Sequence, residues 1–223
     1  MRKLWLLFTF IAVSLAEQQD LSGKMFVFPR ESNTAYVRLT PSVTKTFTSV
    51  TVCLRFFSDL NRSQTLFSLA LPTQPNGLLL WREKQDVYQV WYGSEFLSFS
   101  VSADRLDAWN SVCATRSSDT GLHQFWINGR HTAKKGLRAG TSLAGIPIII
   151  LGQDQDSYGG GFKDTDSFVG MLTDVQMWDY VLPDSEIQFF DSGLPFSGGN
   201  VLDWGSLEFT KYGYVVTDNV TNV

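Results

Sequence analysis

Residues 49–57 read SVTVCLRFF, and this stretch decides the fold. Every second residue faces the same side of an extended chain, and the set on one side is Val50, Val52, Leu54 and Phe56. Alternation with a period of two predicts a β-strand with one face buried against a core.

Further short runs of this type continue along the chain, at residues 78–81, 87–92, 96–101, 125–127 and 168–178. Asn128-Gly129 predicts a tight hairpin turn, and the β-branched run 147–151 predicts a strand buried on both faces. Residues 183–190 begin with proline and acids, which favour a helix start. Regular short strands with one short helix predict an all-β sandwich or jelly roll.

Composition narrows the function. The chain has 223 residues, 43% of them hydrophobic, which excludes a disordered protein. Its net charge of −4 disfavours general binding to nucleic acid or to anionic membranes. Two cysteines exclude a small disulfide-framework protein and a four-cysteine zinc site.

The first residues predict export. Residues 1–16 combine a basic start, an apolar run and small residues before the cleavage point, so we expect a cleaved signal peptide followed by one domain over 17–223. The apolar run is shorter than the roughly 20 residues of a membrane span. We therefore expect a secreted protein rather than an integral membrane protein, with Cys53 joined to Cys113. Asn61 and Asn219 match the glycosylation pattern.

Residues 151–167 carry the chemistry. This segment leaves a predicted buried strand and holds four carboxylates, those of Asp154, Asp156, Asp164 and Asp166. Clustering like charges on one loop costs free energy unless a cation lies among them. Oxygen ligands of this kind suit Ca²⁺. Asp154 and Asp156 can face the same side, with the Gln155 carbonyl between them. A solvated acidic loop is the alternative.

Several motifs resemble the pentraxin family. The segments 152–160 (GQDQDSYGG), 167–170 (SFVG) and 177–179 (MWD) resemble its calcium loop and following strand. Further resemblances run in order through nearly the whole chain, at residues 20–24, 26–31, 125–129, 135–137 and 201–204. Around Cys113 the sequence departs from the family motif, because Ser111 replaces a histidine and Arg116 a tryptophan.

The resemblance implies a flattened, lectin-like jelly roll, a cyclic homopentamer and a disulfide across the sandwich. It also implies two calcium ions held by Asn76, Asp154, the Gln155 carbonyl and Asp156, with Asp164 and Asp166 at the second ion. Pro75 and Lys163 stand where the family has acids, so one ion is the alternative.

The ligand site implied by the resemblance lies beside the calcium. Trp81, Trp91 and Glu95 match positions that receive phosphocholine, and a quaternary ammonium suits an aromatic face with a nearby carboxylate. A bulky residue at Trp91 favours phosphoethanolamine or acidic sugars instead. Core packing of both tryptophans is the alternative.

The resemblance implies a calcium-dependent recognition protein of innate immunity that binds microbes or damaged cells. Family positions for contacts with complement or Fc receptors correspond to Asn128 and Phe190. Two other functions remain open. A glycoside hydrolase would use Asp154 and Asp156 as its carboxylates, and a calcium-independent sugar or protein binder would follow from loss of the metal site.

Overall fold

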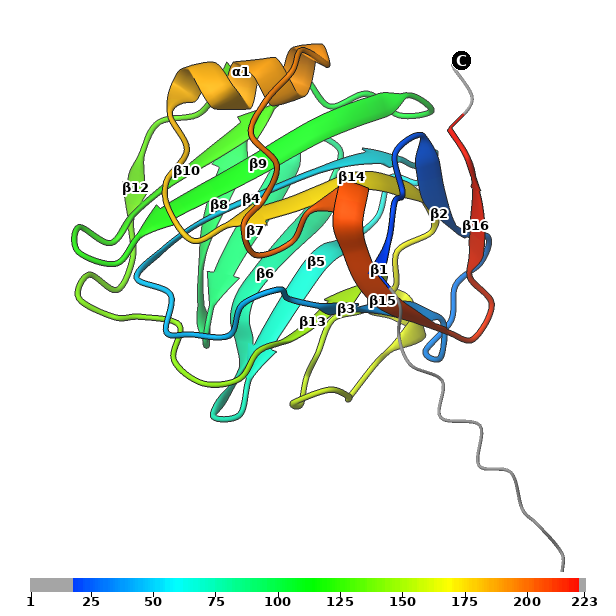
Figure 1. Ribbon diagram of the computed structural model, residues 1–223, viewed down its shortest axis with the longest axis horizontal. Helices are drawn as coiled ribbons and strands as arrows, with labels where there is room; N and C mark the ends of the chain where they lie inside the picture. Colours follow the sequence, from blue (N-terminus) through cyan, green and yellow to red (C-terminus); the bar gives the residue numbers. More distant parts are fainter. Residues whose placement is uncertain (1–17, 221–223) are drawn as a thin grey trace, which may run out of the picture.

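Two antiparallel sheets lie face to face in the computed structural model, which describes residues 18–220 (Figure 1). The first sheet has the spatial order β1 (Gln18–Gln19), β15 (Leu207–Tyr212), β3 (Tyr36–Thr40), β13 (Ile148–Leu151), β5 (Gln64–Leu71), β6 (Gln74–Lys84), β7 (Val87–Tyr92) and β8 (Glu95–Ser100). The second has the order β11 (Arg130–His131), β10 (Leu122–Ile127), β9 (Trp109–Ser117), β4 (Ser49–Phe57), β14 (Gly170–Trp178), β2 (Lys24–Phe28) and β16 (Val216–Asn219), and β12 (Lys135–Gly136) also pairs with β10. The predicted all-β sandwich is confirmed; the predicted signal segment 1–16 lies outside the described residues.

Strand β4 shows how the alternating pattern builds the core. Val52, Leu54 and Phe56 are fully buried in the main cluster between the sheets. Cys53 points to the opposite face of the same sheet and belongs to a second, smaller cluster. The period of two in the sequence therefore becomes two separate apolar layers, one on each face of the second sheet.

The predicted hairpin turn at Asn128-Gly129 joins β10 to β11. Ile127 pairs with Arg130, and both central residues have positive φ, 45° and 73°, as a tight two-residue hairpin turn requires. A Cβ on Gly129 would lie 2.7 Å from Asp191 Oδ2, so a larger residue here would have to displace that carboxylate.

The predicted helix is α1 (Asp184–Ser192), and it covers the outer face of the second sheet (Figure 1). It extends two residues beyond the predicted end, and Gly193 closes it in the left-handed conformation with φ 67°. Ile187 and Phe190 are its buried residues. No helix within residues 18–220 is long and apolar enough to cross a bilayer.

The disulfide lies beneath α1. Cys53 and Cys113 are bonded, as predicted, but they are direct register partners on the neighbouring strands β4 and β9. The expectation that this bond crosses the sandwich is wrong, because the alternation of β4 turns Cys53 away from the facing sheet. The bond therefore links two strands of one sheet and packs with the buried side chains of α1.

Arg116, which departs from the family motif, is buried at the edge of the core. Its guanidinium lies 4.1 Å from the centroid of the Tyr92 ring. It donates to Ser118 Oγ at 3.0 Å and to the Thr141 carbonyl at 2.6 Å. Burial lowers the pKa of this guanidinium. The planar guanidinium of Arg116 thus stands where the family has a tryptophan, and it stacks on the Tyr92 ring.

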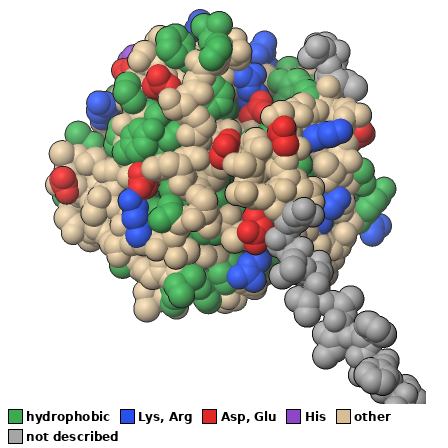
Figure 2. All heavy atoms as spheres, viewed as in Figure 1, with side chains coloured by type: hydrophobic (Ala, Val, Ile, Leu, Met, Phe, Trp, Pro, Cys, Tyr) green, Lys and Arg blue, Asp and Glu red, His purple; other side chains and the backbone are tan. Residues whose placement is uncertain are grey.

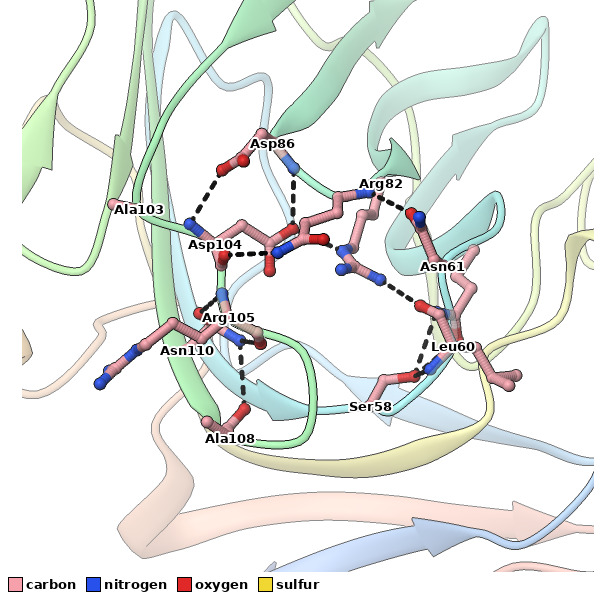
Figure 3. Close-up of polar contacts among 12 residues, drawn as sticks. Ser58, Leu60, Asn61, Arg82, Asp86, Ala103, Asp104, Arg105, Ala108 and Asn110 are labelled. Carbon is pink, nitrogen blue, oxygen red and sulfur yellow. Dashed lines mark hydrogen bonds and ion pairs between the residues drawn. The ribbon is translucent and has the colours of Figure 1, made fainter.

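A buried ion pair fixes the β6–β7 hairpin to the segment after β8 (Figure 3). Arg82 Nε and Asp104 Oδ2 lie 2.8 Å apart, and both side chains have 0% exposure. Arg82 Nη1 also donates to the Leu60 carbonyl at 2.6 Å, and the Asp86 backbone N–H donates to Asp104 Oδ2 at 3.2 Å. The pair therefore holds together three segments that are distant in sequence.

Candidate functional site

The acidic loop follows β13 and lies on the first sheet, on the opposite side of the sandwich from α1 (Figure 1). Two fully buried glutamines anchor it. Gln153 Nε2 donates to the Ala35 carbonyl at 3.0 Å, and Gln155 Nε2 donates to the carbonyls of Ser68 and Ile148 at 3.1 and 3.0 Å. Because these glutamines face the protein, Asp154 and Asp156 take the alternate positions between and after them.

Asp154 is the electrostatic centre of the loop. Asp154 is 8% exposed, and its Oδ1 has no hydrogen-bond partner among the described residues. Burial, and then the neighbouring carboxylates of Asp156 and Asp166, raise the pKa of Asp154 to about 7. A buried carboxylate with free lone pairs beside other acids is stabilised by a cation.

Asn76 brings a second free oxygen. It lies on β6, and its buried Oδ1 has no hydrogen-bond partner within residues 18–220. Asn76 and Asp156 line the same open depression, of about 490 Å³. The oxygens of Asn76, Asp154 and Asp156 are hard donors of the type that suits Ca²⁺.

Lys163 supplies a competing positive charge. Its Nζ lies 2.7 Å from Asp156 Oδ2, and this contact raises the pKa of the ammonium. Asp166 also interacts electrostatically with Asp154 and with Lys163. Asp164 accepts a hydrogen bond from the Thr165 backbone N–H at 2.9 Å and starts a short 3₁₀ turn. Within the described residues no three His, Cys, Asp or Glu side chains gather closely enough to hold a metal, so a site here needs Asn76 and carbonyl oxygens.

The two tryptophans lie on the outer face of the first sheet and are half-buried. Trp81 Nε1 donates to Glu83 Oε2 at 2.8 Å, and the Trp91 ring packs on Phe96 with centroids 4.4 Å apart. Neither belongs to a buried core cluster. The core-packing alternative is therefore wrong for both residues, although neither lines the depression beside Asp156.

Glu95, the third ligand candidate, is engaged within the protein. Its Oε2 lies 2.5 Å from Arg138 Nε. Arg138 lines the depression together with Gln74, and sequence reasoning missed both residues. Arg138 directly follows the 135–137 motif, but nothing in its local sequence indicates a partner 43 residues earlier.

The remaining sequence candidates fall outside this site. Asn61 and Asn219 are exposed, and each side-chain oxygen accepts a hydrogen bond, from the Gln85 backbone N–H and Lys24 Nζ respectively. Their glycosylation stays a prediction. Asn128 belongs to the β10–β11 turn, and Phe190 is 1% exposed, so the Phe190 side chain is not available for a receptor contact.

His123 lies apart from the acidic loop. His123 is buried on β10 in the second sheet, whereas Asp154 follows β13 in the first. Burial lowers the pKa of His123 to about 4, so this imidazole is neutral at pH 7.

On the face shown in Figure 2, acidic and basic side chains are interspersed and form no large basic area among the described residues.

Comparison with known proteins gives a consistent result. The Pentaxin family model matches residues 24–219. Serum amyloid P-component from Rattus norvegicus is 42% identical, covering 96% of this chain and 93% of the rat protein. The Homo sapiens protein of the same name is 41% identical, covering 95% of each chain. The heptameric SAP-like pentraxin from Limulus polyphemus superposes with a TM-score of 0.83 at 24% identity, over 90% of this chain and 96% of that one.

Proposed function

The chain belongs to the pentaxin family, and from this premise we propose that it is a secreted, calcium-dependent pattern-recognition protein of innate immunity. Members of the family bind calcium and assemble into cyclic oligomers. Its ligands are phosphocholine, phosphoethanolamine or related anionic headgroups and glycans on microbes or damaged cells. We propose binding rather than catalysis as the activity.

One observation carries the proposal. Buried oxygens on Asp154 and Asn76 have no hydrogen-bond partner in the described part of the chain, and Asn76 and Asp156 line the same depression. An unsatisfied buried acceptor costs about 1–3 kcal/mol, which a coordinated cation offsets. When bound, calcium supplies a positive centre for an oxyanion of the ligand. Asp154, Asp156, Asn76 and the Gln155 carbonyl are the ligands we assign to it, with Asp166 and Asp164 at a second ion.

Assembly into an oligomer would increase the overall affinity for a surface that carries many ligands. A homopentamer, which the family resemblance implies, would present five weak sites to repeated headgroups on one surface. Simultaneous contacts raise the overall affinity because each later contact is intramolecular. Recruitment of complement or Fc receptors would then use the face that bears α1.

Calorimetric titration of the metal-stripped protein with Ca²⁺ tests the function. We expect heat at a stoichiometry of one or two ions per chain, followed by calcium-dependent retention on immobilised phosphoethanolamine. The absence of both heat and a shift in melting temperature would contradict the proposal.

Replacing Lys163 with glutamate is expected to strengthen calcium binding. The substitution removes the ammonium that pairs with Asp156 at 2.7 Å and adds a carboxylate. Calcium affinity depends on ligand charge, so we expect roughly tenfold tighter binding, about 1.4 kcal/mol, or a second ion in the titration. Lys163→Gln is the control, because it removes the ammonium charge without adding a carboxylate, and its calcium affinity should fall between those of the wild type and Lys163→Glu.

Replacing Trp81 with alanine is expected to weaken headgroup binding and to leave calcium binding intact. Trp81 is half-buried on the outer face, and removing an aromatic contact is worth about 1 kcal/mol, or roughly fivefold in affinity. Retention on phosphoethanolamine and calcium calorimetry would be measured on the same preparation. Unchanged retention would remove Trp81 from the ligand site.

A calcium-independent sugar or protein binder is the second candidate. It is favoured by the Lys163–Asp156 ion pair, which neutralises one proposed ligand without a metal. Retention on immobilised ligand, measured with and without calcium, separates the two functions, because ligand binding that persists without calcium supports this second one.

A further inference from the structure

The depression beside Asp156 is bordered by three segments that meet in space. Gln74 and Asn76 come from the start of β6, Gly93 from the β7–β8 turn, and Arg138 from the chain after β12. The Gly93 backbone N–H donates to the Asn76 carbonyl at 2.5 Å, which ties the first two segments together. The ends of the two hairpins therefore form one continuous wall.

Two nitrogen donors converge on one point in this wall. A Cβ on Gly93 would lie 2.6 Å from Gln74 Nε2 and 3.2 Å from Arg138 Nη1. Gln74 Nε2 is buried and has no acceptor within residues 18–220. Gly93 has a φ of 67°, so its backbone also favours glycine. A side chain at position 93 would therefore press on both nitrogens.

Arg138 is held in place by several contacts. Its Nε pairs with Glu95 Oε2 at 2.5 Å, and its guanidinium lies 6.0 Å from the centroid of the Tyr92 ring. Its own backbone has a φ of 48°, a conformation that is uncommon outside glycine and clusters at binding sites. The Arg138 carbonyl accepts from Thr141 Oγ1 at 2.7 Å, which fixes this backbone.

The charge balance disfavours a cationic ligand group here. The resemblance assigns Glu95 to the ammonium of phosphocholine, but Arg138 already occupies that carboxylate. On the other side, Lys163 pairs with Asp156. A ligand ammonium would have to displace Arg138, whereas a ligand carboxylate would meet the converging donors of Arg138 and Gln74.

We infer that this depression is an anion subsite, in which Arg138 Nη1 and Gln74 Nε2 bind a carboxylate of the ligand beside Gly93. This inference rests on the proposed function for the neighbouring calcium site, which takes the first oxyanion. The preferred ligands then carry two anionic groups, as phosphorylated carboxylic acids and acidic sugars do, instead of a phosphate with a cationic tail. Charge-assisted hydrogen bonds of this kind are the strong ones.

Two probes of matched length test the subsite. Phosphoethanolamine and 2-phosphoglycolate both carry a phosphate on a two-carbon unit, but the first ends in an ammonium and the second in a carboxylate. With calcium present, we expect 2-phosphoglycolate to inhibit retention on immobilised phosphoethanolamine at a concentration roughly tenfold lower than free phosphoethanolamine does. Equal or reversed potency would overturn the inference.

Arg138→Gln is the decisive variant, and Arg130→Gln is its control because Arg130 is an exposed arginine at the β10–β11 turn. The first should abolish the preference for 2-phosphoglycolate and strengthen phosphoethanolamine binding, since it frees Glu95. The second should change neither. A preference that survives Arg138→Gln would contradict the role of Arg138.

A second experiment tests the subsite without calcium. Protein stripped with a chelating resin, without soluble chelator, is mixed with 2-phosphoglycolate, and the phosphorus NMR line width of the ligand is measured. Broadening in the wild type and in Arg130→Gln, but not in Arg138→Gln, supports the subsite. Equal line widths in all three overturn it. If this experiment succeeds while neither probe shows calcium-dependent binding, the proposed function fails and the anion subsite stands.

Discussion

Replacing Asp154 with asparagine is expected to abolish calcium binding and, in the metal-free protein, to increase stability at alkaline pH. The side chain keeps its shape but loses the charge of a buried carboxylate that is 8% exposed. A saturating ligand at 100 times its dissociation constant stabilises a folded protein by about 2.7 kcal/mol. The variant should lose the whole of this calcium-induced rise in melting temperature, and its calorimetric titration should show no heat.

The alkaline effect follows from the raised pKa of Asp154. In the unfolded chain this carboxyl ionises near pH 4, whereas in the metal-free fold burial and Asp156 keep it protonated until about pH 7. The folded state therefore loses stability relative to the unfolded state as the pH rises from about 4 to 7, by up to about 4 kcal/mol. Asparagine has no proton to lose, so this pH dependence disappears.

Denaturant melts of metal-free protein at pH 5 and pH 8, with and without added calcium, measure both effects. Asp119→Asn is a matched control because Asp119 is exposed, and it should behave as wild type. An Asp154→Asn protein that still gains stability from calcium would remove Asp154 from the metal site. Identical pH profiles for wild type and variant would contradict the assigned pKa.

Replacing Arg82 with methionine is expected to destabilise the fold strongly. It leaves Asp104 as a charge with no exposure to solvent and without its ion-pair partner. Breaking one side of a buried pair costs about 3–5 kcal/mol, which lowers the melting temperature by roughly 6–20 °C in a domain of this size. Equilibrium urea unfolding would measure the loss.

The double variant Arg82→Met/Asp104→Leu separates charge from packing. It replaces both partners with apolar groups, so it should be less destabilised than Arg82→Met alone. Glu31→Gln serves as a surface control, because the Glu31–Arg62 pair is partly exposed and should contribute less than about 1 kcal/mol. A double variant as unstable as the single one would show that the ion pair is not the source of the loss.

Local patterns in the sequence predicted the elements well. The alternation of residues 49–57 matches β4, and Asn128-Gly129 forms the expected turn. The short helix starts one residue after Pro183, as the proline and acids predicted. These features depend on the period of side chains and on backbone preferences, both of which act within a few residues.

The sequence by itself therefore determined an all-β chain with one helix, its cysteine pair and the loop on which Asp154 and Asp156 lie. Only the tertiary structure decided that the disulfide stays within one sheet, that Lys163 pairs with Asp156, and that Arg138 reaches Glu95. Strand register and loop paths bring such partners together across long separations in sequence, and burial then determines which charges remain free. The local pattern predicts neither of these, because the alternation of side chains along a strand fixes the face on which each one lies but not the residue that it contacts there.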